Sequence, residues 1–199
     1  MLASSERSPG ATEQGETSTS GSVGGGAMRW FLMGFMGSGK TELGRLLAER
    51  WQVPFVDLDR LVEERAGRPI AAIFAEEGEA SFRHRESLAL RSLAGHESAV
   101  IALGGGTPLA PENRDWLRRN GTTVWLNPSF ETILERLPPA ERAHRPLFAE
   151  EERAAALYRE RLAVYRTAAD LELMVEPQEG PEEVLQRLEA KLAEQPCST

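Results

Sequence analysis

The stretch that decides the fold is GFMGSGKT, residues 34–41, which matches G-x-x-x-x-G-K-[ST] at every fixed position. Glycines in such a stretch let the backbone curl so that its N–H groups converge on phosphate oxygens, and the following helix adds the positive end of its dipole. Lys40 would reach the β- and γ-phosphates, and the Thr41 hydroxyl would bind Mg²⁺. The motif predicts a nucleoside triphosphate site made by Gly37, Ser38, Gly39, Lys40 and Thr41.

The neighbours of the motif support this interpretation. The apolar run RWFLMG at 29–34 predicts a buried strand before it, and KTELGRLLAERW at 40–51 predicts a helix after it. A glycine-rich surface turn is the alternative, but such a turn needs neither element beside it. A strand that leads into a glycine loop and then a helix is the arrangement that phosphate binding at a helix N-terminus requires.

Outward from the motif, short apolar runs alternate with helical stretches. The predicted strands are 29–34, 53–59, 99–106, 122–127 and 171–176. The predicted helices are 40–51, 60–66, 70–77, 79–94, 111–120, 129–137, 150–166 and 181–194. This alternation indicates an α/β protein with a five-stranded parallel sheet between two helical layers, and the motif at 34–41 makes it a P-loop NTPase. Ligands of such sheets bind beyond the carboxyl ends of the strands.

The chain divides into a tail and one domain. Residues 1–27 are mostly Ser, Thr and Gly and cannot bury enough apolar surface to offset their ordering entropy, so we expect a disordered tail. Met28 directly precedes the first strand, and we hypothesise that it is the physiological start. Residues 28–199 are predicted to form a single domain, with substrate-binding helices at about 57–94 and a charged lid at about 138–150.

Composition limits the class of partner. The 199 residues carry a formal charge of −8 and have a sequence pI near 5.1, which gives no support for nucleic-acid binding but allows anionic small substrates at local cations. The single cysteine, Cys197, cannot form an internal disulfide. No apolar run approaches the ~20 residues of a membrane helix, and no secretory signal is evident at the start. We therefore expect a cytoplasmic protein without membrane or nucleic-acid partners.

Two carboxylate-containing motifs follow the P-loop. Asp57 and Asp59 end the second predicted strand, where alternation would put both side chains on one side, although a helix cap with a solvated neighbour is an equally good interpretation. In FRHRE, residues 82–86, Arg83 and Glu86 are three positions apart and share a helical face. Glu86 can hold the guanidinium so that its fork faces a carboxylate, while an ordinary surface ion pair is the alternative.

Three further motifs contain glycine or arginine. The triplet Gly104, Gly105 and Gly106 ends an apolar strand, which indicates close approach of another group or a tight turn. Arg145 lies in an R-P-L sequence within the charged loop. Arg161 begins R-x-x-x-Y-R in the next helix and, by itself, could be a solvated residue.

Taken together, these motifs resemble the shikimate kinase family over essentially all of residues 29–192. The resemblance implies a P-loop NTPase fold of the nucleoside-monophosphate-kinase-like type, in which the charged loop at about 138–150 is a lid. In the acceptor site, the resemblance implies that Asp59 contacts the acceptor hydroxyl and is the base, and that Arg83 and Arg161 clamp the shikimate carboxylate. It also implies that N–H groups of the glycine triplet reach a shikimate hydroxyl, and that Phe74 lines the pocket, core packing being the other interpretation of Phe74.

In the donor site, the resemblance implies that Asp57 and Thr41 orient Mg²⁺ and that Arg145 closes over the phosphates. The implied reaction is direct in-line transfer from ATP to the 3-hydroxyl of shikimate, giving shikimate 3-phosphate and ADP in aromatic amino-acid synthesis. The catalytic residues would be Lys40, Asp59 and Arg145, and the resemblance suggests a monomer whose substrates are ATP and shikimate.

Two alternatives and two departures accompany this prediction. Another small-molecule P-loop kinase, for gluconate or a nucleoside monophosphate, would share the cradle and lid but not the downstream motifs, and a regulatory module would have lost catalytic residues.

The family often has Ser-Thr after the P-loop lysine, where this chain has Thr41-Glu42. Pro138-Pro139 occupies a stretch that usually carries an arginine near the adenine, and Arg136 or Arg142 could substitute.

Overall fold

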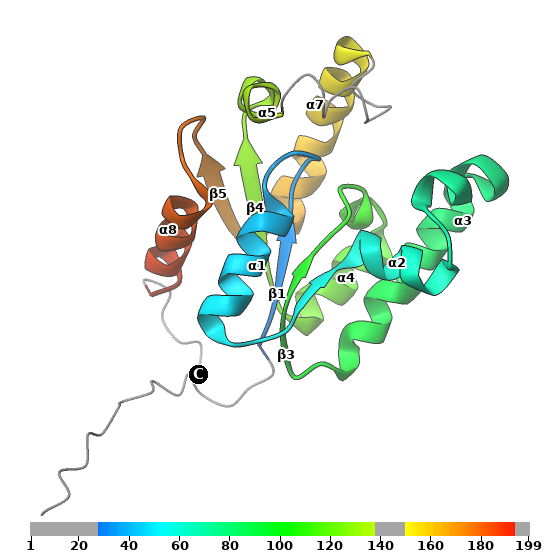
Figure 1. The fold of residues 1–199 in the computed structure, drawn as a ribbon, viewed down its shortest axis with the longest axis horizontal. Helices are drawn as coiled ribbons and strands as arrows, with labels where there is room; N and C mark the ends of the chain where they lie inside the picture. Colours follow the sequence, from blue (N-terminus) through cyan, green and yellow to red (C-terminus); the bar gives the residue numbers. More distant parts are fainter. Residues whose placement is uncertain (1–27, 138–149, 194–199) are drawn as a thin grey trace, which may run out of the picture.

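The computed structural model describes residues 28–137 and 150–193 of the chain (Figure 1). The predicted tail, and the predicted lid with its R-P-L motif and Arg145, lie outside the described residues apart from the last lid residue, Glu150. The predictions made for those segments therefore stay predictions.

The domain is built on a sheet of five parallel strands in the order β2-β3-β1-β4-β5, as predicted for the fold class. Its central strand carries the sequence WFLM, which is apolar at every position because both faces of a parallel sheet are covered. The strands are β1 (Met28–Met33), β2 (Phe55–Asp57), β3 (Ser98–Ala102), β4 (Thr122–Pro128) and β5 (Leu171–Val175).

Alternation along β1 assigns its side chains to two separate cores. Trp30 and Leu32 pack with α1 and α8 on one face, whereas Phe31 and Met33 pack with α3, α4 and α7 on the other (Figure 1). The α-helices are α1 (Lys40–Trp51), α2 (Leu58–Ala66), α3 (Ile70–Ser92), α4 (Pro111–Asn120), α5 (Phe130–Arg136), α7 (Glu151–Ala168) and α8 (Pro181–Ala193). Two short 3₁₀ helices are η1 (Leu93–Gly95) and η2 (Thr107–Leu109).

Two predicted strands were too long at their carboxyl ends. β2 ends at Asp57, whose side chain accepts a hydrogen bond from the Arg60 N–H at 3.3 Å and caps α2, so Asp59 lies in the first turn of α2 rather than on a strand. The predicted strand alternation of the two aspartates is therefore wrong. β3 ends at Ala102, and the glycine triplet forms the turn that leads into η2.

The predicted break between the helices at 70–77 and 79–94 is confirmed as a kink inside α3. Gly78 has φ 80° and ψ 174°, a backbone conformation that is open essentially only to glycine. Nothing lies within 4 Å of a Cβ built at Gly78, so the backbone and not the space around it requires glycine here.

In the described ranges 28–137 and 150–193, none of the helices combines the length and the apolar character that crossing a membrane would demand.

Candidate active site

A cavity of about 720 Å³ opens beyond the carboxyl ends of β1, β2 and β3. The P-loop forms its floor, α2 and α3 form one wall, and the glycine turn after β3 forms another. A third group of residues, from the end of α5 and the segment between β5 and α8, lines the opposite end: Arg136, Leu137, Pro177, Glu179 and Pro181. This is the place where a parallel sheet of this kind binds ligands.

The P-loop has a backbone conformation that would suit the predicted phosphate cradle. Gly37 and Gly39 have positive φ of 80° and 91°, and α1 begins directly afterwards with no side-chain cap from its N-cap residue Gly39. The first N–H groups of a helix have no partner within the helix and so can bind an anion. The Lys40 ammonium donates to the carbonyls of Gly34 and Phe35 at 3.0 and 2.9 Å, which holds it over the loop. The Ser38 side chain is buried and does not line the cavity.

The two residues predicted to bind a metal lie side by side. The Thr41 hydroxyl donates to Asp57 Oδ2 at 2.9 Å, and both residues line the cavity. A hydroxyl and a carboxylate supply the hard oxygen ligands that Mg²⁺ prefers, and Mg²⁺ in phosphoryl-transfer sites is held by few protein oxygens together with substrate phosphates. The residues present therefore fit the ion.

Asp59 lines the cavity near the glycine turn, next to a second carboxylate. A Cβ built at Gly104 would lie 2.5 Å from both Asp59 Oδ1 and Glu86 Oε1, so the two carboxylates approach the same point of the glycine turn. Burial, and then the negative charge of Glu86, raise the pKa of Asp59 to about 6, although Lys40 and Arg83 oppose this shift. A carboxylate with such a pKa is a better base than an ordinary aspartate.

Glu86 is completely buried and has two partners. Glu86 Oε2 accepts from Arg83 Nη1 at 2.9 Å, and Glu86 Oε1 accepts from the buried Thr107 hydroxyl at 2.6 Å. Glu79 binds the other edge of the Arg83 guanidinium, with Nη2 at 3.1 Å and Nε at 3.3 Å. Burial lowers the pKa of Arg83, but Glu86 and Glu79 outweigh burial and raise it, so the guanidinium stays charged. Arg83 also approaches Gly106 so closely that a Cβ there would collide with the guanidinium.

Arg161 reaches the cavity from α7 and is only 7% exposed. Its guanidinium carbon lies 5.6 Å from the centre of the Phe35 ring, and Nη1 lies beside Gly105. Nε has no hydrogen-bond partner among residues 28–137 and 150–193. A buried cationic donor without a partner is costly, and the guanidinium that carries this donor lines the cavity.

The structure brings the predicted site residues of the described ranges to one cavity, except for the side chain of Ser38. The residues of this set that line the cavity are Gly37, Gly39, Lys40, Thr41, Asp57, Asp59, Arg83, Gly104, Gly105, Gly106 and Arg161, together with Phe74. Arg145, for which a role at the phosphates was predicted, lies outside the described residues. The roles of all these residues stay predictions.

Sequence reasoning missed two residues that hold this site. Thr107, directly after the glycine triplet, binds Glu86. The Tyr165 hydroxyl donates to the Gly105 carbonyl at 2.5 Å, and burial raises its pKa to about 12, so it remains a donor at neutral pH. The spacing of Arg161 and Tyr165, four positions apart on one helical face, could have indicated that both reach the same turn.

Comparison with known proteins gives a consistent result. The family model described as "Shikimate kinase" matches residues 36–193. Shikimate kinase from Symbiobacterium thermophilum is 43% identical over 170 residues, which cover 82% of this chain and 98% of that protein. The crystal structure of shikimate kinase from Aquifex aeolicus has 37% identity and a TM-score of 0.70, covering 83% of this chain and 96% of that one. Shikimate kinase from Acinetobacter baumannii in complex with shikimate has 32% identity and a TM-score of 0.74, with 84% and 94% covered.

The matched region begins within the P-loop, at residue 36, and contains the kinked α3, the glycine turn and Arg161, so the likeness includes the residues that line the cavity. On these grounds, the chain belongs to the shikimate kinase family.

Proposed function

We propose that the protein transfers the γ-phosphoryl group of ATP in line to the 3-hydroxyl of shikimate within this cavity. The donor would lie on the P-loop, and the acceptor would lie between α3 and the glycine turn. As a member of its family, the protein catalyses the ATP-dependent phosphorylation of shikimate. In the transfer, the bond from the γ-phosphorus to the β-phosphate oxygen breaks as a bond to the shikimate oxygen forms. The proton of the hydroxyl goes to the protein, and ADP and shikimate 3-phosphate leave.

At the donor end, the P-loop N–H groups and the positive end of α1 would bind the phosphates, and Lys40 would move from its loop carbonyls to the β- and γ-phosphates. Thr41 and Asp57 would hold Mg²⁺, which would neutralise phosphate charge. The adenine would lie at the end lined by Arg136 and Pro177. Arg136 is one of the two arginines that we considered for this place, and it is held there by the Glu179 carbonyl at 2.7 Å.

At the acceptor end, one observation supports the proposal most directly. Two guanidiniums from different helices, Arg83 on α3 and Arg161 on α7, reach the same turn beside Asp59. Arg83 is fixed by Glu86 and Glu79, whereas Arg161 has an orphaned Nε in a buried position. A pair of cations facing a carboxylate base fits an acceptor that has a carboxylate on one side and a reacting hydroxyl on the other.

Asp59 would accept the proton of the hydroxyl. Its pKa of about 6 keeps it largely ionised at neutral pH while making it more basic than an ordinary aspartate. Most of the rate enhancement would come from positioning and from neutralising phosphoryl charge, with Lys40 and the predicted lid residue Arg145 acting on that charge. The cytoplasmic location and the monomeric state stay predictions from the sequence.

The proposal is tested by an ADP-release assay on the purified full chain with ATP and Mg²⁺. Parallel reactions contain shikimate, gluconate, a nucleoside monophosphate or no acceptor. We expect release to depend on shikimate alone, and NMR of the product to place the phosphate on the 3-hydroxyl. Release with a different acceptor would keep the donor site and reject the acceptor assignment.

Asp59→Asn tests the base. The substitution keeps the size of the side chain but cannot accept the proton, so kcat should fall by about 10²- to 10⁴-fold, while the shikimate KM changes little. Steady-state kinetics with varied shikimate measures both constants. A variant that keeps more than roughly a tenth of the wild-type kcat would show that Asp59 does not act as the base.

The same substitution should alter the pH dependence of stability. The carboxyl has a pKa of 3.8 when unperturbed and about 6 in the folded protein, so folding becomes less favourable as pH rises between these values. The Tm of Asp59→Asn should therefore match wild type near pH 4 and exceed it above pH 6, by about 2–4 °C for each kcal/mol of relief. Scanning calorimetry from pH 4 to pH 8 measures the difference. A difference that does not change with pH would contradict the raised pKa.

Arg83→Lys tests the carboxylate clamp. Lysine keeps the charge but loses the planar fork that Glu86 and Glu79 hold, so the shikimate KM should rise by about 10- to 100-fold, as expected for a lost charged hydrogen bond. The ATP KM should stay within about twofold. Arg91→Lys is a matched control, because Arg91 lies on the same helix and does not line the cavity. An unchanged shikimate KM in Arg83→Lys would remove Arg83 from the clamp.

A further inference from the structure

The kink at Gly78 divides α3 into two halves that line different parts of the acceptor end. Ile70 and Phe74 come from the half before the kink, and Phe82, Arg83 and Glu86 come from the half after it. Phe74 is 38% exposed, and its ring centre lies 4.8 Å from that of the buried Phe82. The angle between the halves therefore sets the distance between an apolar wall and the guanidinium of Arg83.

The backbone alone does not fix this angle. A residue with non-helical φ and ψ interrupts the regular hydrogen-bond ladder of a helix, so the two halves are joined there by fewer backbone contacts. Glycine is also the residue with the widest range of accessible conformations. Side-chain contacts across the kink are needed to hold one angle.

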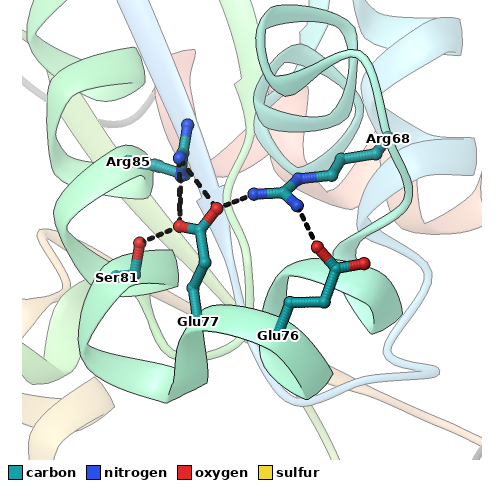
Figure 2. A network of polar contacts seen from close by, with 5 residues as sticks. All are labelled: Arg68, Glu76, Glu77, Ser81 and Arg85. Atoms are coloured by element: carbon teal, nitrogen blue, oxygen red, sulfur yellow. Dashed lines mark hydrogen bonds and ion pairs between the residues drawn. The ribbon is translucent and has the colours of Figure 1, made fainter.

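Glu77, the last residue before the kink, makes these contacts (Figure 2). Its carboxylate accepts two hydrogen bonds from Arg85 Nη2, at 3.0 and 3.1 Å, and one from the Ser81 hydroxyl, and both donors lie beyond the kink. Arg68, which precedes α3, forms an ion pair with the same carboxylate. One carboxylate thus joins the segment before α3, the first half and the second half.

The surroundings of Glu77 distinguish it from a surface ion pair. Its side chain is 26% exposed, whereas that of its neighbour Glu76 is 61% exposed and, within residues 28–137 and 150–193, binds Arg68 alone, on the same side of the kink. Arg68 and Arg85 both point their guanidiniums at Glu77, so removing its charge leaves two cations facing each other (Figure 2). Isolated exposed pairs contribute little, but several charges that share one centre form a network, and a network contributes more.

We propose that Glu77 is a positioning residue for the acceptor. It fixes the angle of α3 at Gly78 and thereby places Phe74 against the half that carries Arg83. This inference rests on the proposed function, because it takes the space between the two halves and the glycine turn as the acceptor site. Glu77 does not line the cavity, so its action is through the shape of the wall.

Glu77→Gln is the test, since it keeps the size of the side chain and removes the charge. We expect the shikimate KM, and the shikimate Kd from calorimetry, to rise about three- to tenfold, the range for loosening one partly exposed charge network. The kcat and the ATP KM should stay within about twofold, because the P-loop lies outside α3. Glu77→Asp, which keeps the charge, should recover part of the loss.

Two controls separate positioning from a general loss of stability. Glu76→Gln removes a neighbouring charge that does not span the kink, and it should leave the shikimate KM unchanged. Raising the salt concentration from about 0.05 M to about 0.5 M shortens the Debye length from roughly 14 Å to roughly 4 Å, which weakens part of the network in the wild type. The ratio of the shikimate KM of Glu77→Gln to that of the wild type should therefore fall towards one.

A double-mutant cycle identifies the partner. If Glu77 acts through Arg85, Arg85→Gln should raise the shikimate KM to a similar extent, and the double variant should be no worse than either single variant. Three results for Glu77→Gln would each overturn the inference: equal rises in the shikimate KM and the ATP KM, a shikimate KM equal to that of the wild type, or a KM ratio to wild type that does not change with salt. Absence of shikimate-dependent ADP release in the wild type would instead reject the proposed function, so the two failures are distinguishable.

Discussion

The proposed acceptor end of the site depends on the hydrogen bonds that the buried Glu86 carboxylate accepts. It is completely buried, and it is stabilised there by the Arg83 guanidinium from its own helix and by the Thr107 hydroxyl from the turn after β3. A buried carboxylate without such partners would be very costly. Helix α3 and the glycine turn are therefore joined by a group that tolerates little change in their relative position.

The same carboxylate determines the chemistry around it. Its negative charge fixes the fork of Arg83, and it is the largest cause, after burial, of the raised pKa of Asp59. One buried group thus orients a cation and makes a neighbouring carboxylate more basic. The glycine turn makes this possible, because side chains at Gly104 or Gly106 would occupy the positions of these charged groups.

The sequence predicted the fold well because its signals are local. A buried parallel strand shows as a continuous apolar run, and the break at Gly78 shows as a glycine inside a helical pattern. The errors occurred at the carboxyl ends of β2 and β3, where apolar residues continue but the backbone turns. Asp57 shows the reason: the residue that ends β2 also caps α2, so the chain turns into a helix before the apolar pattern of the strand stops.

The proposed donor and acceptor sites differ in how far apart their residues lie in the sequence. The donor site is a contiguous motif, so residues 34–41 were enough to predict a phosphate cradle. The acceptor site is assembled from α2, α3, the glycine turn and α7, and each of its motifs had an ordinary structural alternative when taken alone. Residues that only hold other residues, such as Thr107 and Glu77, have no motif of their own, because their contribution is a contact across space. Under this proposal, acceptor specificity resides in packing between distant segments, whereas the phosphate cradle resides in one loop.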